Sequence, residues 1–318
     1  MPAQKFVTVT VEEVRAEAAG VVSLVLAARG GRALTAWTPG AHVDVILSRD
    51  LVRQYSLTSA PDGPTWRIAV LREPESRGGS AHLHDRVRPG DTLLVGTPRN
   101  TFPLDLTADR YVFVAGGIGI TPILPMAAAA EEAGKDWKLL YLGRSARSMA
   151  FTAELARYGE KVRLHRDDES GIADLTDELD RLGSEDACLY ACGPTGLLAA
   201  VEKYAAASPG ARLALERFTS GSAEGYPRED DRAFTVETRD GREIEVGAQQ
   251  SVLDALSAAG IRTLSSCREG ACGTCETAVL AGVPDHRDQV LSDEERAAGD
   301  TMMICVSRCR GDRLVLDV

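Results

Sequence analysis

Short apolar runs separated by turn-forming residues fill the first hundred positions of the chain. The runs are rich in valine, leucine and isoleucine, and turns such as Pro39-Gly40 and Pro89-Gly90-Asp91 lie between them. Runs of this length and spacing are typical of β-strands in an antiparallel barrel. We therefore predict barrel strands at residues 6–14, 21–27, 42–47, 54–58, 66–71 and 92–96.

After residue 108 the pattern changes to apolar runs that alternate with stretches rich in alanine, leucine and glutamate. This alternation predicts parallel strands joined by helices, as in a doubly wound α/β domain. The uncharged run at residues 111–130 is long enough to cross a membrane, but its glycines and prolines favour a buried strand, a turn and a helix. The predicted strands are residues 111–115, 138–142, 161–166 and 187–191.

A third region follows residues 219–231, which have the composition of a linker. It contains predicted strands around a turn at Asp240-Gly241, a helix at residues 251–259 and a final strand at residues 313–318. The chain is therefore predicted to be multi-domain, with domains at residues 1–107, 108–220 and 232–318 and a linker at residues 221–231.

The net charge of −11 argues against nucleic acid and membrane as partners, and it favours docking to a basic surface on another protein. Seven cysteines are too few and too clustered for a secreted disulfide scaffold, and the first residues do not resemble a signal peptide. We therefore expect a cytoplasmic protein.

The most specific motif is Cys267-x4-Cys272-x2-Cys275, with Cys305 thirty residues further on. This is the ligand spacing of a plant-type [2Fe–2S] cluster. Small residues let the loop wrap closely and let backbone N–H groups point at the sulfurs. Free or disulfide-bonded cysteines are the alternative, but the spacing in a glycine-rich loop favours the cluster. Cys309 could in principle replace Cys305 as the fourth ligand.

Two motifs in the barrel favour a flavin site. Arg53-Gln54-Tyr55-Ser56 combines a cation for phosphate, a ring for stacking and a hydroxyl for a ring nitrogen. Residues 76–80, Ser-Arg-Gly-Gly-Ser, precede a predicted helix at residues 81–87, where free N–H groups can bind phosphate. A glycine turn with a serine N-cap is the alternative for the second motif, but the two motifs together favour flavin.

Two motifs in the second domain favour a dinucleotide. Gly116-Gly117-Ile118-Gly119-Ile120-Thr121 lies where the first parallel strand should lead into the first helix. It is not G-x-G-x-x-G, but its glycines would still let the backbone approach a pyrophosphate. Cys192-Gly193 follows the last predicted strand, at the edge where open α/β sheets bind ligands. A small buried thiol is the alternative interpretation of Cys192.

In this order, the motifs resemble the phthalate dioxygenase reductase family, to which vanillate demethylase reductases belong. The resemblance covers the whole chain. It implies an antiparallel β-barrel that binds FMN, a doubly wound α/β domain that binds NADH, and a C-terminal β-grasp plant-type ferredoxin domain. It also implies a flavin/iron–sulfur oxidoreductase that passes electrons from NADH through FMN and the [2Fe–2S] cluster to a terminal oxygenase, often of the Rieske type, or to a demethylase.

The resemblance further implies a role for each motif residue. Ser56 would lie near flavin N5, Cys192 would border nicotinamide C4, and Glu216 and Phe218 would close over the reactive face of the flavin. The remaining flavin contacts implied are Arg53, Gln54, Tyr55, Val70, Leu71, Arg72, Gly78, Gly79 and Ser80. The nucleotide contacts implied are Gly116, Gly117, Gly119, Thr121, Arg144, Cys192 and Gly193.

The family pattern also implies the cluster ligands and the kind of flavin. The sequence around Cys305 matches the family, so the ligands implied are Cys267, Cys272, Cys275 and Cys305. Related FAD enzymes commonly place a C-terminal aromatic residue on the flavin, whereas this chain continues into another domain, which implies FMN.

Alternatives concern the nucleotide, the partner and the class of protein. Arg144 could contact an adenosine 2′-phosphate and favour NADPH, whereas residues 167–169, Asp-Asp-Glu, would repel an extra phosphate and favour NADH. The partner could be a cytochrome P450 or another oxygenase. A free-standing quinone or flavin reductase would have no use for the third domain, and an iron–sulfur sensor would need a basic output surface that this acidic chain lacks.

Overall fold

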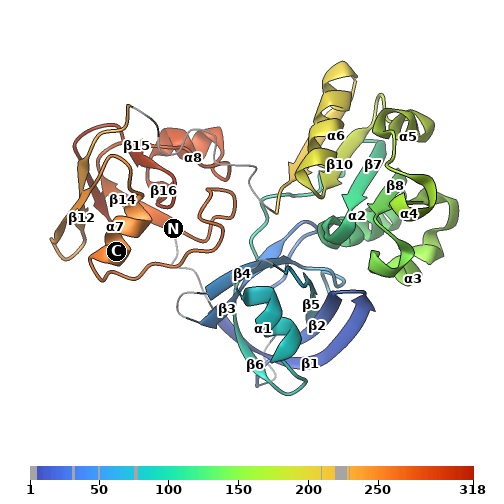
Figure 1. The fold of residues 1–318 in the computed structure, drawn as a ribbon, viewed down its shortest axis with the longest axis horizontal. Helices are drawn as coiled ribbons and strands as arrows, with labels where there is room; N and C mark the ends of the chain where they lie inside the picture. Colours follow the sequence, from blue (N-terminus) through green and yellow to red (C-terminus); the bar gives the residue numbers. More distant parts are fainter. Residues whose placement is uncertain are drawn as a thin grey trace. The chain divides into compact units, whose positions relative to one another are not determined.

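Figure 1 shows the computed structural model, which describes residues 6–30, 33–48, 51–74, 78–208, 210–218, 228 and 230–318. Contact density divides the chain into two compact units. One is Gln4–Leu47 with Gln54–Phe218, and the other is Thr219–Val318 with Met1–Ala3 and Ser48–Arg53. The first unit contains two sheets, and the second contains one main sheet.

An antiparallel barrel forms the first half of the larger unit. Its strands are β1 (Phe6–Ala18), β2 (Val21–Ala28), β3 (His42–Ser48), β4 (Leu51–Ser56), β5 (Thr65–Leu71) and β6 (Thr92–Gly96), in the order β4-β3-β6-β1-β2-β5. A bridge between Leu57 and Ile68 joins the two ends of this order and closes the barrel. Alternating apolar side chains such as Val9, Leu24 and Trp66 fill the interior. One helix, α1 (Gly79–Asp85), follows β5.

A five-stranded parallel sheet forms the second half of the larger unit. Its strands are β7 (Arg110–Gly116), β8 (Asp136–Gly143), β9 (Val162–Arg166), β10 (Cys188–Cys192) and β11 (Arg212–Glu216), in the order β11-β10-β7-β8-β9. The helices are α2 (Ile120–Glu132), α3 (Thr152–Leu155), α4 (Asp167–Ser170), α5 (Leu175–Leu182) and α6 (Thr195–Ala207).

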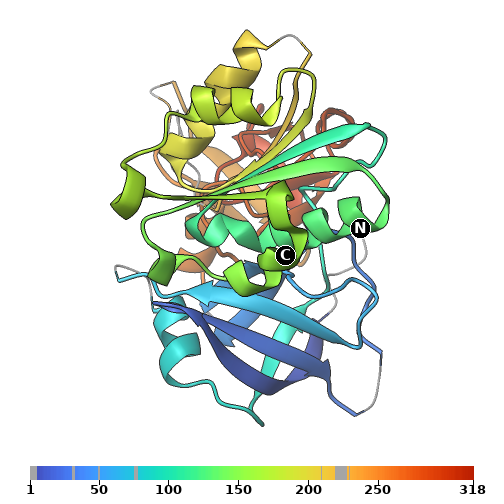
Figure 2. The ribbon, with the colours of Figure 1, turned by 90° about the vertical axis from the view of Figure 1, so that its right-hand side faces the viewer.

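Helices cover both faces of this sheet, as Figure 2 shows for the green and yellow segments. On one face, Ile120 and Ile123 of α2 pack with Phe113. On the other face, Leu179 of α5 packs in one core with Leu198 of α6. Strand order reverses between β7 and β10, so the carboxyl ends of these two strands form the switch point at which doubly wound sheets bind ligands.

The C-terminal unit is a mixed sheet with one main helix. Its elements are β12 (Phe234–Thr238), β13 (Glu243–Val246), α7 (Val252–Ala258), β14 (Glu276–Ala281), β15 (Pro284–Asp285), α8 (Asp293–Ala298), β16 (Thr301–Met303), β17 (Arg308–Cys309) and β18 (Arg313–Leu316). The main sheet has the order β13-β12-β18-β14-β16, and β12 runs parallel to β18. This is a β-grasp arrangement, with Leu253 and Leu256 of α7 packed into the core.

The predicted antiparallel and doubly wound parallel sheets are therefore both present, with small shifts at element ends. The helix predicted at residues 81–87 is α1, which begins two residues earlier because Gly78 has φ 90° and turns the chain there. The strand predicted at residues 54–58 is β4, which ends at Ser56. The run at residues 111–130 is the strand, turn and helix that we expected. No helix in the described ranges is long and apolar enough to cross a membrane.

Candidate functional site

A buried hydroxyl lies at the end of β4, where the barrel closes. Ser56 is 4% exposed, and its Oγ has no hydrogen-bond partner among the described residues. Burying a hydroxyl without a partner is unfavourable, and native structures usually avoid it. The position therefore fits a bound group that presents a hydrogen-bonding atom, as the N5 edge of a flavin does.

The side chain of Gln54, two residues earlier on β4, is held from within the barrel. Its Nε2 donates to Asp44 Oδ1 at 3.0 Å, and Asp44 is only 1% exposed. Arg99 donates to both oxygens of the same carboxylate, at 2.9 and 3.0 Å. This fork fixes the carboxylate and, through it, the amide of Gln54. Sequence reasoning missed Asp44 and Arg99, because the contact spans 55 residues.

The end of β5 and the start of α1 carry the other predicted flavin contacts. Val70 and Leu71 pair with β2, and the backbone N–H of Arg72 donates to Gly20 O at 2.8 Å. The guanidinium of Arg72 pairs with Asp85 of α1. The backbone of these residues is thus ordered by the barrel, and the Arg72 side chain is engaged by α1.

The glycine motif leads directly into α1. Gly78 has left-handed backbone geometry, and a Cβ built on it would meet no atom within 4 Å. Ser80 is buried, and its Oγ accepts a hydrogen bond from Glu73 N at 3.1 Å. Ser76 and Arg77 of this motif lie outside the described residues. Gly78 leaves the backbone at the helix start open to close approach, whereas Gly79 is buried.

At the switch point of the parallel sheet, three of the predicted glycines are required by close packing. A Cβ on Gly119 would lie 2.2 Å from Cys192 O, and one on Gly193 would lie 3.0 Å from Gly116 Cα. The loops after β7 and β10 can therefore meet only because these residues have no side chain. Gly117, with φ 54°, faces open space instead. Such a bare backbone at a sheet's carboxyl edge can accommodate a pyrophosphate.

Thr121 is the second residue of α2, the helix that follows these glycines. It is 2% exposed, and its Oγ1 donates to Ile118 O at 2.9 Å. The hydroxyl thus stabilises the turn between β7 and α2.

Cys192 and Glu216 are neighbours on adjacent parallel strands. They occupy paired positions at the ends of β10 and β11. Cys192 is fully buried, and the Glu216 Oε2 atom is buried without a partner among the described residues. Burial raises the pKa of Glu216 to about 8, and burial together with the nearby Glu216 charge raises the pKa of Cys192. At pH 7 the Glu216 carboxyl is mainly protonated and can donate a hydrogen bond.

The strand that presents Glu216 was not predicted. Residues 212–216, Arg-Leu-Ala-Leu-Glu, form β11, and their short alternating pattern is the signal that sequence reasoning missed. Phe218, two residues after the strand, is 44% exposed. An exposed aromatic ring is available for stacking.

Arg144 lies next to residues 167–169, the acidic run that favours NADH. It follows β8, and its carbonyl accepts a hydrogen bond from Asp168 N at 3.1 Å. The guanidinium of the nearby Arg166 is already paired with Glu169. Arg144 is thus joined through its backbone to the acidic segment at residues 167–169.

Four cysteine thiols converge in the C-terminal unit. Cys267 contacts the thiols of Cys272 and Cys305, and Cys305 also contacts Cys275. Backbone N–H groups point at these sulfurs, among them Glu269 N, which lies 3.3 Å from Cys267 Sγ. Positive φ angles at glycines 270 and 273 and at residue 268 let the loop curl around the thiols.

The four thiols suit a two-iron cluster. A [2Fe–2S] cluster needs four thiolates spread over two irons, and the loop at residues 267–275 together with Cys305 offers them. Cys309 is engaged elsewhere, since its Sγ is 3.3 Å from Gly311 N and 3.4 Å from Arg313 O.

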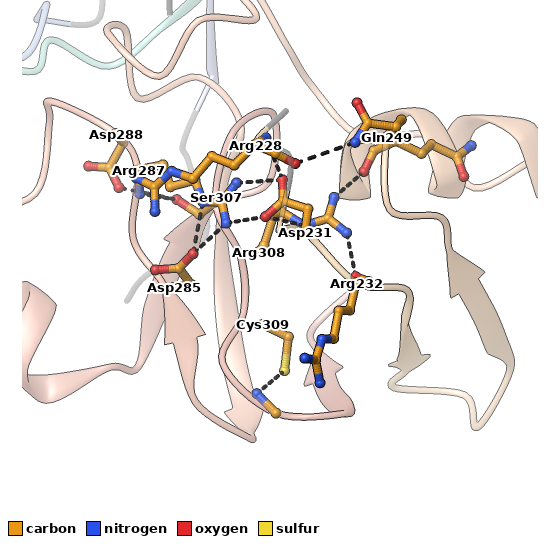
Figure 3. Close-up of polar contacts among 12 residues, drawn as sticks. Arg228, Asp231, Arg232, Gln249, Asp285, Arg287, Asp288, Ser307, Arg308 and Cys309 are labelled. Atoms are coloured by element: carbon orange, nitrogen blue, oxygen red, sulfur yellow. Dashed lines mark hydrogen bonds and ion pairs between the residues drawn. The ribbon is translucent and has the colours of Figure 1, made fainter. Parts of the chain in front are cut away.

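A buried ion network supports the segment that carries Cys305 (Figure 3). Arg287 donates to both carboxylate oxygens of Asp231 at 2.8 and 2.6 Å, and the Arg308 guanidinium lies 3.7 Å from the same carboxylate. The hydrogen bond from Arg287 lowers the pKa of Asp231 to about 2, so this carboxylate is charged at neutral pH. Arg287 N also donates to Ser307 Oγ. The network thus ties residue 231 to the chain just after Cys305.

Comparison with known proteins agrees with this geometry. The 2Fe-2S iron-sulfur cluster binding domain family matches residues 235–310. Phenoxybenzoate dioxygenase subunit beta from Ectopseudomonas oleovorans is 45% identical over 287 residues, which are 90% of this chain and 89% of that protein.

Solved structures match 98% of this chain. Phthalate dioxygenase reductase, described as modular for electron transfer from pyridine nucleotides to [2Fe–2S], is 33% identical with a TM-score of 0.70, and 98% of it is covered. An intact type IV self-sufficient cytochrome P450 monooxygenase is 44% identical with a TM-score of 0.85. The chain spans 41% of that longer protein. The predicted fold class is thus confirmed, and the chain belongs to the phthalate dioxygenase reductase family of flavin and iron–sulfur oxidoreductases.

Proposed function

We propose that this protein is the reductase component of an oxygenase system, and that it passes electrons from NADH through FMN and a [2Fe–2S] cluster to a terminal oxygenase of the Rieske type. The observation that carries the proposal is the convergence of four cysteine thiols in a chain that also has a flavin-type barrel and a doubly wound parallel sheet. The combination suits the conversion of a two-electron donor into single electrons, which is the chemistry that flavin and cluster supply when bound.

At the flavin, we assign the ring contacts to β4 and β5 and the phosphate contacts to the start of α1. Ser56 would offer its buried hydroxyl to N5, and Gln54 is oriented for the ring by Asp44. The other flavin residues that we propose are Arg53, Tyr55, Val70, Leu71, Arg72, Gly78, Gly79 and Ser80.

At the nucleotide, we assign the pyrophosphate to the loops after β7 and β10. Gly117 would leave room for it, and Cys192 would border the nicotinamide. Glu216 would hold a proton beside the reacting rings, because its carboxyl is mainly protonated at neutral pH. The other residues that we propose here are Gly116, Gly119, Thr121, Gly193 and Phe218.

We propose NADH rather than NADPH as the donor. Arg144 is available at the end of β8, but Asp168 lies against it. A 2′-phosphate bound by Arg144 would meet this acidic segment, and the repulsion would oppose NADPH binding.

At the cluster, we propose Cys267, Cys272, Cys275 and Cys305 as the ligands. The contacts among their thiols and the separate hydrogen bonds of Cys309 support this choice. The predicted domain boundaries, the linker and the cytoplasmic location stay predictions.

A cytochrome P450 is the second candidate for the electron acceptor, because a type IV P450 contains a segment 44% identical to this chain. Both candidates use the same flow of electrons and differ only in partner. A screen with purified terminal oxygenases and P450s separates them, since only the true partner should turn over at catalytic concentrations of this reductase.

The proposed function predicts that the purified protein releases FMN on denaturation and contains iron and sulfide. NADH should bleach the flavin far more readily than NADPH does. Chromatography of the released flavin, metal analysis and stopped-flow absorbance test these points. Release of FAD, or equal use of both nucleotides, would contradict the corresponding assignment.

Substitution of Ser56 tests the flavin assignment. Losing one positioned hydrogen bond at a reacting atom commonly costs about ten- to a thousandfold in rate, or about 1.4–4 kcal/mol of barrier. Ser56→Ala should therefore slow reduction of the flavin by NADH while FMN stays bound, and Arg53→Ala should mainly weaken flavin retention. Stopped-flow bleaching measures the first effect and flavin content the second. A wild-type rate in Ser56→Ala would rule out this residue at N5.

A further inference from the structure

We propose that Arg67 is a positioning residue that holds the flavin barrel against the nucleotide domain and thereby sets the rate of hydride transfer. This inference rests on the proposed function. Arg67 lies on β5 and contacts both halves of the larger unit, although none of the motifs in the sequence includes it.

Within the barrel, Arg67 secures the chain just beyond Ser56. Its Nε donates to Thr58 Oγ1 at 2.9 Å, and its Nη2 donates to Thr58 O at 3.0 Å. Thr58 N donates in return to Arg67 O at 2.8 Å. Thr58 is 3% exposed and lies two residues after the hydroxyl that we assign to flavin N5. The guanidinium therefore fixes the end of β4.

Toward the nucleotide domain, the same guanidinium binds α3. Its Nη1 and Nη2 donate to the two carboxylate oxygens of Glu154, the latter at 3.0 Å. Its central carbon lies 4.9 Å from the centre of the Phe151 ring, which is a cation–π distance. Only 13% of the Arg67 side chain is exposed, so water and salt weaken this ion pair less than they weaken a surface pair.

The backbone at Phe151 is adapted to this contact. Phe151 has φ 60° and ψ 14°, a left-handed conformation that is uncommon for a bulky residue and costs energy. It is 3% exposed and packs in the core that also includes Val21 and Ala69 of the barrel. The strained residue thus places its ring both in the interface between barrel and nucleotide domain and beside the guanidinium.

These contacts matter because the hydride must cross between groups held by different halves of the unit. Ser56 belongs to the barrel, whereas Cys192 and Glu216 belong to the parallel sheet. A misplacement of about 1 Å between reacting groups can cost about a hundredfold in rate. Arg67 joins β4 to α3 with a rigid, planar fork, which a lysine cannot reproduce.

The experiment compares Arg67→Gln, Arg67→Lys and Glu154→Gln with the wild-type holoprotein by stopped-flow reduction with NADH. We expect Arg67→Gln to slow flavin bleaching by about ten- to a hundredfold, with Arg67→Lys close behind and flavin and iron contents unchanged. NADH deuterated at C4 should show an isotope effect on the slowed step. The double variant Arg67→Gln/Glu154→Gln should be no slower than Arg67→Gln alone, because both residues act through one contact.

Arg163→Gln is the matched control, since it removes a forked arginine–glutamate pair, with Glu178, that lies wholly within the nucleotide domain. It should bleach at the wild-type rate. The inference would be overturned if Arg67→Gln bleached its flavin within about twofold of the wild-type rate. It would also be overturned if Arg67→Gln lost flavin while the protein that retained flavin bleached at the normal rate. If Arg67→Gln does not fold, Glu154→Gln decides the question in the same way. Failure of NADH to reduce the wild-type flavin would instead reject the proposed function.

Discussion

Replacing Cys305 with serine should remove the iron–sulfur cluster or severely weaken its binding. Cys305 is 3% exposed and contacts the thiols of Cys267 and Cys275, so it stands at the centre of the proposed ligand set. A serine hydroxyl is not a thiolate and would leave one iron short of a sulfur ligand. Iron and sulfide content, together with the visible absorption of the protein, measure the loss. Electron delivery to cytochrome c should fall with the cluster, while bleaching of the flavin by NADH should persist.

Cys309→Ser is the matched control for Cys305→Ser. Cys309 lies four residues later on β17, and its sulfur is engaged by Gly311 N and Arg313 O instead of by the other thiols. Its substitution should leave iron content and spectrum intact. An iron-depleted Cys309 variant beside a normal Cys305 variant would reverse the ligand assignment.

Removal of the C-terminal unit should separate the two kinds of electron transfer. A fragment ending near residue 220 keeps the flavin and nucleotide motifs and nearly all of the larger compact unit. We expect it to bind FMN and to reduce ferricyanide with NADH. It should fail to support a terminal oxygenase and should reduce cytochrome c poorly, because the one-electron exit has been removed.

Turnover assays with the fragment and the full chain make this comparison. Adding the separate C-terminal unit back at an equal concentration should restore little activity. In the full chain, the covalent linkage raises the effective concentration of the two parts to roughly the millimolar range, and the separate parts lack this advantage. Oxygenase support by the fragment at the level of the full chain would show that the cluster is not on the route.

The motifs that depend on local spacing were evident from the sequence. The cysteines at 267, 272 and 275 lie five and three residues apart in a glycine-rich loop, which is the spacing of ligands to a [2Fe–2S] cluster. Because this spacing is local, the cluster could be predicted without knowledge of the fold. The glycines at 116 and 119 were predicted to let the backbone approach a pyrophosphate. The structure adds another reason for them, because a Cβ at either position would collide with the loop after β10. Most strands were also predictable, because the two-residue repeat of apolar side chains in a strand is visible within a short stretch of sequence.

The contacts that orient these motifs were decided by tertiary structure alone. Asp44 accepts a hydrogen bond from Gln54 and is itself held by Arg99, 55 residues further along the chain. Arg67 reaches Glu154 across 87 residues. The pKa of Glu216 depends on its burial at the end of β11, beside Cys192. Sequence by itself determined which chemical groups the chain carries, and the family resemblance implied the roles that we propose for them. Burial and long-range contacts leave no repeating pattern in the sequence. The orientation and the protonation state of those groups were therefore decided by the tertiary structure.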